Sequence, residues 1–293
     1  MASKEKQGNG KEERQVQVGQ DSELTQTTVG WGDPLEKRRI KMEMNNGIAT
    51  VVLDNPDRMN IFDSSVLQEF DEIIDDIVKN EGTKVVLLTS NSLKGFTAGA
   101  DITEMASHDP EEAKRFSELG HRIARRLERD VPPVVVALKG FVLGGGLEFA
   151  CACDLRVASE DCIFSQPEID IGVIPGWGGT QRLAKVVGIA KAREMIYTGA
   201  RVDAYQALEI GLVNHVVPRE ELDSVAQAYA KGLSSKSRRA LMAAKRSIRM
   251  SLEMDYEDGL DYETKEWASL FGTHDQKEGM KAFLEKRKPK FED

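Results

Sequence analysis

Glu148 stands in a stretch of sequence that suits acid–base chemistry. It is the only charged residue between Lys139 and Asp154, and glycines and small or apolar residues surround it. Apolar surroundings disfavour the charged form of a carboxyl group, so they raise its pKa toward the range useful for proton transfer near neutral pH. Glu148 is therefore a candidate general acid or base. The alternative is that it only complements the dipole at the start of a helix.

A second acidic residue, Glu168, lies in a comparable setting. Residues 166–180 carry two charges, Glu168 and Asp170, among prolines, glycines and apolar residues. In an extended segment residues two apart share a face, but the flanking prolines and glycines leave that geometry open. Glu168 is the partner that a paired-carboxyl mechanism needs beside Glu148.

Three glycines at 144–146 lie where a strand or loop gives way to an apolar helix. Because they lack side chains, a ligand can approach the backbone closely. The first turn of a helix leaves N–H groups unpaired and carries a partial positive charge, so it can hold an oxygen that becomes anionic. A turn of small residues at 95–102 is a second place where backbone groups can face a ligand.

The elements that must position these residues alternate between strands and helices. Asn45-Asn46-Gly47 between two alternating apolar segments predicts a hairpin. Asp63 or Ser64 is expected to cap a helix, and Pro110 to begin a long one. Strands are predicted at residues 39–44, 48–53, 84–90, 131–138, 155–158, 163–165 and 211–217. Further helices are predicted at residues 183–187, 190–198, 204–210, 220–233, 237–251, 256–271 and 276–286. This order indicates an α/β fold.

The first 36 residues are predicted to form a disordered arm. They are rich in Gln, Glu, Lys, Gly and Thr and poor in large apolar side chains, so they bury too little surface to offset the entropy of ordering. The segment has no apolar core of a signal peptide, and its five acidic residues argue against a transit peptide. A cytoplasmic location is therefore expected.

Composition narrows the class of protein. A chain of 293 residues with 40% hydrophobic and 30% charged residues is expected to form a globular body, and no apolar run approaches the length of a bilayer span. The net charge of −9 argues against nucleic-acid binding. Cys151, Cys153 and Cys162 do not make a disulfide framework and are expected to be small buried thiols. Four scattered histidines show no ligand spacing, so no metal is predicted.

Five blocks of this sequence resemble the crotonase, or enoyl-CoA hydratase/isomerase, superfamily. Together they place the resemblance over residues 38–291. The blocks are FTAGADITEM (96–105), ALKGFVLGGGLEFACACDLRVA (137–158), FSQPEIDIGVIPGWGGTQRL (164–183), GLVNHVV (211–217) and DQKEGMKAFLEKRKPKF (275–291).

The resemblance implies a fold and an assembly. The fold is a crotonase-like spiral of ββα units at residues 37–230, followed by a C-terminal helical region at residues 231–293 that serves oligomerisation and active-site closure. Members usually assemble as homotrimers or homohexamers. No cofactor is implied, because coenzyme A is part of the substrate.

The resemblance also implies roles for four residues. The acyl-CoA thioester oxygen is expected between the backbone N–H groups of Ala100 and Gly145. Hydratases carry two glutamates, which match Glu148 and Glu168 here. Many isomerases lack one of them, so the pair favours hydration of a 2-enoyl-CoA, with Glu148 activating water and Glu168 on the acid side.

Other positions are expected to contact the CoA moiety. By motif position Ala98, Asp101 and Ile102 lie near the nucleotide, and Lys286 reaches a phosphate, if necessary from a neighbouring subunit. Arg58 is a further candidate for a phosphate and Phe283 for the adenine. A solvated charge for the basic residues, and core packing for Phe283, are the alternatives.

Two positions depart from the pattern of many relatives. Trp177 occupies a site where a small residue is frequent, so its ring is expected either to shorten the acyl pocket, which favours short chains, or only to pack beside it. Asp170 would add a third acid at the border of the site.

Competing functions remain open from the sequence. The same oxyanion site serves isomerisation, thioester hydrolysis and decarboxylation of acyl-CoA substrates. Some relatives bind RNA, and Lys245, Arg246 and Arg249 form a weak basic cluster. The net charge makes that partner unexpected.

Overall fold

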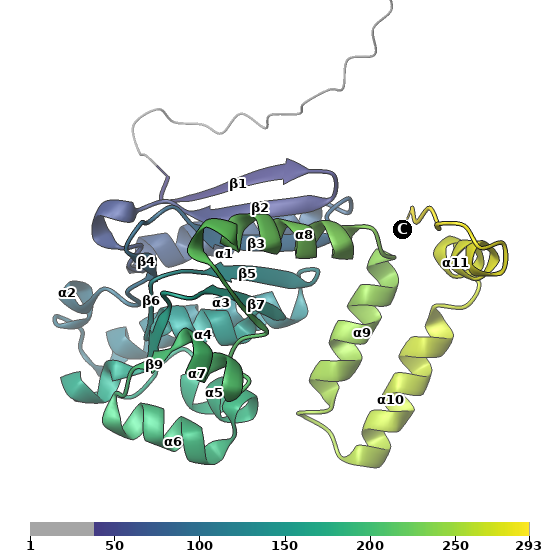
Figure 1. Cartoon of the computed structure of the whole chain (residues 1–293). Coiled ribbons are helices and arrows are strands. Elements are labelled where there is room, and N and C mark those ends of the chain that lie inside the picture. Colours follow the sequence, from purple (N-terminus) through teal and green to yellow (C-terminus); the bar gives the residue numbers. More distant parts are fainter. Residues whose placement is uncertain (1–37, 293) are drawn as a thin grey trace, which may run out of the picture. The chain divides into compact units, whose positions relative to one another are not determined.

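Residues 38–292 are described by the computed structural model, and the predicted arm at residues 1–36 lies outside them. The largest element is a six-stranded mixed sheet (Figure 1). In spatial order its strands are β1 (Ile40–Asn45), β2 (Ile48–Leu53), β3 (Val85–Ser90), β5 (Val134–Leu138), β7 (Leu155–Ser159) and β10 (His215–Val217).

The predicted hairpin at the start of this sheet is confirmed. β1 and β2 pair antiparallel, and the two turn residues Asn46 and Gly47 both have positive φ, at 50° and 77°. That conformation is the one that Asn-Gly adopts readily in a tight hairpin. From β2 onward, β2, β3, β5, β7 and β10 are parallel, as expected for strands built from continuous apolar runs.

Helices cover both faces of the six-stranded sheet. α1 (Ser64–Lys79) and α3 (Pro110–Arg129) pack on one face, and α8 (Leu222–Ser234) covers the other (Figure 1). Asp63 caps α1 and Asp109 caps α3 through a capping box, so both predicted helix starts are confirmed. The predicted domain boundary at residue 230 falls inside α8.

A second, four-stranded sheet forms where the chain continues past the strands of the first. β3, β5 and β7 are each followed by a short strand of the second sheet. Its strands are β4 (Gly95–Thr97), β6 (Phe141–Leu143), β8 (Ile163–Ser165) and β9 (Val202–Asp203). α2 (Ile102–Met105) follows β4, and α4 (Gly145–Ala152) follows β6. Two strands and then a helix therefore recur along the chain, which confirms the predicted α/β spiral of ββα units.

The C-terminal half is helical, as predicted. After β8 come the 3-10 turn η2 (Pro167–Ile171), α5 (Gly179–Val187), α6 (Ile189–Thr198) and α7 (Ala204–Glu209). The last helices are α9 (Arg238–Met250), α10 (Tyr256–Ser269) and α11 (His274–Leu284). No helix of the described part of the chain is both long and apolar enough to cross a membrane.

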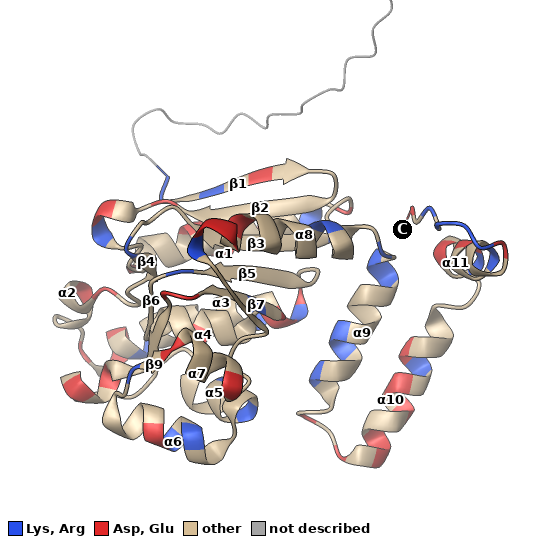
Figure 2. Cartoon of the chain, viewed as in Figure 1, with Lys and Arg blue, Asp and Glu red and all other residues tan. Residues whose placement is uncertain are grey.

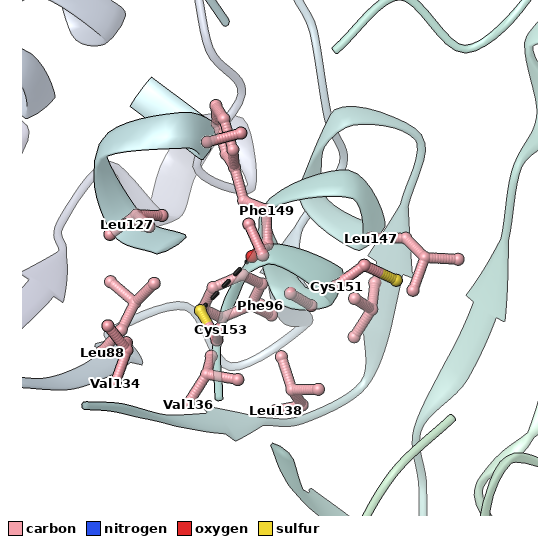
Figure 3. Packing of buried hydrophobic residues seen from close by; sticks show 14 of the residues in the cluster. Leu88, Phe96, Leu127, Val134, Val136, Leu138, Leu147, Phe149, Cys151 and Cys153 are labelled. Atoms are coloured by element: carbon pink, nitrogen blue, oxygen red, sulfur yellow. Dashed lines mark hydrogen bonds between the residues drawn. The ribbon is translucent and has the colours of Figure 1, made fainter. Parts of the chain in front are cut away.

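The core beneath α4 is closely packed. Leu147, Phe149, Cys151 and Cys153 of this helix lie among apolar side chains of the neighbouring strands (Figure 3). The Sγ of Cys153 lies 3.3 Å from the Phe149 carbonyl oxygen. All three cysteines are free and buried, as expected, and burial raises the pKa of the Cys151 thiol to about 11.

The basic cluster on α9 is engaged with acidic partners. Lys245 pairs with Asp154, Arg246 with Glu266 of α10, and Arg249 with Glu253. Figure 2 shows acidic residues on α10 beside the basic residues of α9. The cluster therefore presents little free positive charge to an RNA backbone.

Candidate active site

The loops after β4 and β6 bring two backbone N–H groups together. Gly99 has φ +90°, and a Cβ atom placed on it would lie 2.8 Å from the Leu143 carbonyl oxygen and 3.1 Å from the Gly145 nitrogen. Only glycine permits so close an approach in this conformation. Ala100, which follows Gly99, is thereby placed beside the first residue of α4.

The geometry of both N–H groups leaves them free to bind a ligand. Phe62 donates to the Gly99 carbonyl and accepts from the Asp101 N–H, at 2.8 and 2.9 Å. Because alternate residues of a bridged strand point their N–H groups to opposite sides, the Ala100 N–H faces away from Phe62. Gly145 begins α4, where an N–H has no partner within the helix. Within residues 38–292 neither group has a hydrogen-bond acceptor.

Glu148 lies on the first turn of α4 and is almost fully enclosed. Its residue is 2% exposed, and its Oε1 accepts hydrogen bonds from the backbone N–H groups of Trp177 at 2.8 Å and Gly179 at 2.6 Å. Burial raises the pKa of Glu148 to about 7, although the two N–H donors and the charge of Arg182 act in the opposite direction. A carboxyl group with this pKa can accept or donate a proton near neutral pH.

Glu168 lies on η2 and comes close to the same point. A Cβ atom on Gly144 would be 3.2 Å from its Oε1. Burial, together with the negative charge of Glu148, raises the pKa of Glu168 to about 7. The structure therefore brings together the two carboxyl groups that the sequence singled out, on either side of the glycines that carry the N–H donors.

Gln166 contacts Glu168 and lies near Glu148, and it was not identified as a site residue from the sequence. It is fully buried, and its amide nitrogen, turned toward Glu168, lies 2.7 and 3.0 Å from the two carboxylate oxygens. A Cβ atom on Gly179 would meet the Glu148 Oε1 at 3.0 Å and the Gln166 amide at 3.1 Å. The feature of the sequence that could have indicated Gln166 is its position directly before Pro167 and Glu168, in the same apolar loop.

Trp177 packs in the core behind the N–H pair. It is 3% exposed, and its ring lies 5.1 to 6.1 Å, between ring centroids, from Phe62, Phe116 and Phe149. A Cβ atom on Gly145 would lie 2.2 Å from the ring, so the ring fills the space behind that residue. Trp177 therefore supports the start of α4. Its expected effect on the acyl pocket stays a prediction.

Asp170 turns toward the end of α6. Its residue is exposed, and a Cβ atom on Gly199 would lie 2.8 Å from its carboxylate. Residues 167–171 form a 3-10 turn and not an extended segment, so Asp170 and Glu168 do not alternate as on a strand.

The residues expected around the nucleotide lie just before and after Ala100 in the chain. Asp101 is buried, caps α2 by accepting from the Thr103 N–H, and pairs with Arg58 at 2.9 Å. Ile102 is 57% exposed at the start of α2. Ala98 is partly buried and donates its N–H to the Met59 carbonyl.

Lys286 lies in another part of the molecule. It follows α11, and α11 and α2 lie at opposite sides of the view in Figure 1. Lys286 therefore does not join the residues around Ala100 within one chain. Phe283 is 82% exposed, so core packing of this side chain within the chain is wrong.

The arrangement can polarise a carbonyl group and move protons beside it. Two preorganised N–H donors stabilise negative charge that develops on an oxygen. Two carboxyl groups of raised pKa can serve as base and acid on the atoms next to that carbonyl. Among residues 38–292 no three His, Cys, Asp or Glu side chains gather as a metal site would require.

Comparison with known proteins identifies the family. The model of the enoyl-CoA hydratase/isomerase family matches residues 43–293. The chain is 39% identical to the short-chain-enoyl-CoA hydratase of Clostridium acetobutylicum, covering 87% of this chain and 97% of that protein. It is 36% identical to the crotonyl-CoA hydratase of Syntrophomonas wolfei, covering 86% and 97%. The crystal structure of an enoyl-CoA hydratase from Bacillus anthracis superposes with a TM-score of 0.83 at 34% identity, covering 86% of this chain and 98% of that one. The chain belongs to the enoyl-CoA hydratase/isomerase family.

Proposed function

We propose that this protein is an enoyl-CoA hydratase that adds water reversibly to a short-chain 2-enoyl-CoA. The observation that carries the proposal is a pair of carboxyl groups, the buried Glu148 and the partly buried Glu168, beside the N–H groups of Ala100 and Gly145. The names of the Clostridium and Syntrophomonas relatives support a short acyl group.

The proposed mechanism begins with the thioester oxygen between the two N–H groups. Addition of water to the double bond builds an enolate, and the two donors stabilise its negative charge, each contributing about 3–4 kcal/mol in comparable sites. Glu148, held by the Trp177 and Gly179 N–H groups, orients the water and takes its proton. Glu168 supplies the proton to Cα. Because the two groups interact, their titration belongs to the pair.

The substrate's CoA part is proposed to lie along the loop that leads to α2. Ala98, Asp101 and Ile102 border this path, and Arg58 is held there by Asp101. Lys286 of a neighbouring copy is proposed to reach a phosphate, since Lys286 of the same chain lies away from this loop.

We also propose that the chain assembles as a homotrimer or homohexamer. α10 buries none of its own residues, and large apolar side chains on it and just after it are exposed, including Trp267 at 62% and Phe271 at 45%. Burying these side chains against another copy would be favourable.

Product analysis of crotonyl-CoA incubations tests the reaction. Hydration predicts 3-hydroxybutyryl-CoA as the product and no free thiol. Release of free CoA would indicate hydrolysis. Incubation with a 3-enoyl-CoA that gives the 2-enoyl isomer, without hydration of crotonyl-CoA, would indicate an isomerase and overturn the proposal.

A further inference from the structure

The short loop that binds Glu148 is itself held by α3. We call residues 175–179 the clamp loop, because its Trp177 and Gly179 N–H groups both donate to the Glu148 Oε1. Ser117 of α3 donates its hydroxyl to the Gly176 carbonyl at 2.5 Å. The Trp177 ring lies against Gly120 of α3, where a Cβ atom would meet it at 2.3 Å.

A third connection runs through an arginine. Arg182 on α5 donates from Nη1 to the Trp177 carbonyl at 2.9 Å. Its Nε and Nη2 donate to the two carboxylate oxygens of Glu128 on α3, both at 2.7 Å. This bidentate pair is partly buried, with 12% of the Arg182 side chain and 28% of the Glu128 side chain exposed. Such a fork fixes a guanidinium in position as well as in charge.

The carbonyl that Arg182 holds lies between the two N–H groups that bind Glu148. It belongs to the peptide group joining Trp177 to Gly178, so its direction sets the rotation of the clamp loop around the carboxylate. Gly178 has φ +108°, and a Cβ atom on it would lie 2.0 Å from the Arg182 Nη1. Glycine at this position thus makes room for the guanidinium.

We propose that Arg182, anchored by Glu128, is a positioning residue for Glu148: it holds the clamp loop so that both N–H groups grip one carboxylate oxygen. The inference deepens the proposed function and rests on it for the role of Glu148 as a base. Arg182 acts through the backbone of the clamp loop and does not touch the substrate.

The charges around Glu148 make the proposal measurable by titration. Arg182 from α5 favours the ionised form of Glu148, and Glu168 from η2 disfavours it. Beyond Arg182, α3 contributes Glu128 and His121, and His121 has a pKa lowered by burial and by the charge of Arg182. Cys151 on α4 has a pKa of about 11 and stays neutral. Loss of Arg182 is therefore expected to raise the pKa of Glu148.

The test is the pH profile of kcat/KM for four variants. Arg182→Gln removes both charge and anchor, and Arg182→Lys keeps the charge while losing the fork. Glu128→Gln weakens the anchor and also removes a negative charge, which by itself lowers the pKa of Glu148. Arg126→Gln is the control, because Arg126 is also a partly buried α3 residue but pairs with Asp71 and Asp75 of α1. We expect the acid limb to move up by about one pH unit in Arg182→Gln, which lowers kcat/KM about tenfold on that limb.

A smaller upward movement is expected for Arg182→Lys, and none for Arg126→Gln even if its melting temperature falls. In Glu128→Gln the weakened anchor and the lost negative charge act in opposite directions, so its acid limb should move less than that of Arg182→Gln. An acid limb that stays in place in Arg182→Gln overturns the proposal, as does an equal movement in Arg126→Gln. If Arg182→Gln does not fold, the comparison of Arg182→Lys with Arg126→Gln decides in the same way.

A titration that needs no turnover separates this inference from the proposed reaction. In protein labelled with ¹³C at the glutamate carboxyl carbon, the resonance that disappears in Glu148→Gln reports Glu148. Its midpoint is expected to rise in Arg182→Gln, and by less in Arg182→Lys, whatever reaction the enzyme catalyses. Absence of hydration would overturn the proposed function, whereas an unmoved midpoint would overturn the role of Arg182.

Discussion

At the scale of single residues, burial is the main cause of the unusual titration of the site. It raises the pKa of Glu148 and of Glu168, and the two groups also oppose each other's ionisation. One of them can therefore be ionised while the other holds a proton near neutral pH. An acid–base pair needs this state. Ionisation of a buried carboxyl group also lowers the stability of the folded protein.

Ionisation of Glu148 is expected to destabilise the folded protein as pH rises. Its pKa of about 7 in the folded state exceeds the ordinary value of 4.5, so full stability is present below pH 4.5 and is lost as pH rises through 7. The loss amounts to about 3 kcal/mol. Glu148→Gln cannot ionise at this position. The melting temperature of this variant should therefore rise relative to that of wild type as pH increases from 4.5 to 8.

Thermal unfolding across that pH range measures the difference. Glu118→Gln, on the exposed face of α3, is the control and should follow wild type at every pH. A constant difference between Glu148→Gln and wild type would mean that Glu148 does not titrate as described.

Gly145 is expected to tolerate no side chain. A Cβ atom there would lie 2.2 Å from Cζ3 of the buried Trp177 ring, so Gly145→Ala should shift the start of α4 and displace one oxyanion donor. We expect kcat to fall by about 10²-fold and stability by about 1–3 kcal/mol. Steady-state kinetics and thermal unfolding check both expectations.

The matched control is Gly232→Ala on α8, where a Cβ atom meets nothing within 4 Å. This variant should keep its activity and gain slightly in stability, since alanine favours a helix. Full activity in Gly145→Ala would show that the Gly145 N–H does not contribute to the proposed oxyanion site.

The sequence allowed the two glutamates to be chosen because an isolated charge in an apolar run is visible without a structure. Gln166 and Arg182 escaped notice for a physical reason. Their effect depends on contacts with Glu168 and with the Trp177 carbonyl that only the folded chain creates. A glutamine before a proline, or an arginine on an amphipathic helix, carries no such information by itself.

At the scale of elements, long periodic segments were predicted well, and of the short ones β8 was predicted at its observed bounds, 163–165, whereas α2 and β9 were not. α1 buries apolar residues that recur at helical spacing, and the hairpin turn is where Asn-Gly placed it. The buried residues of α1 are Val66, Leu67, Phe70, Ile73, Ile74 and Ile77. α2 and β9 have only 4 and 2 residues. Neither has room for a periodic pattern, so tertiary contacts decide their conformation. The 3-10 turn at residues 167–171 was not predicted either, because the prolines and glycines around it leave no periodic pattern.

A buried lysine joins three elements and gives a prediction at this scale. Lys245 of α9 donates to the Leu127 carbonyl of α3 at 2.7 Å and pairs with Asp154 after α4 at 2.8 Å. Lys245→Met would remove the charge that pairs with Asp154 and the donor to the Leu127 carbonyl, while Asp154 keeps the Val134 N–H. We expect a loss of about 3 kcal/mol in denaturant unfolding.

Lys191→Met is the comparison for that variant, because Lys191 forms an exposed pair with Glu194 within α6. It should cost no more than about 0.5 kcal/mol. Equal effects of the two substitutions would show that the contacts of Lys245 do not anchor α9.

At the scale of the whole molecule, α10 presents apolar side chains that residues 38–292 leave exposed. If a second copy covers them, the mass in solution should be three or six times the 32.5 kDa of one chain. Trp267→Glu places a charge in this surface and should shift the mass in analytical ultracentrifugation toward the monomer. The activity of Trp267→Glu should fall as the assembly dissociates, if Lys286 of a neighbouring copy completes the CoA site.

Leu93→Glu, at an 84% exposed position on the loop after β3, controls for the added charge and should leave the assembly intact. A wild-type protein that sediments as a monomer at micromolar concentration would contradict the proposed assembly.

Glu148 and Glu168 are proposed to hydrate an enoyl thioester together. The most direct test is the loss of the conjugated enoyl absorbance of crotonyl-CoA with wild type, Glu148→Gln and Glu168→Gln side by side. We predict rapid loss with wild type and a decrease of at least about 10²-fold in each variant. Undiminished hydration by either folded variant would contradict the two-carboxyl account.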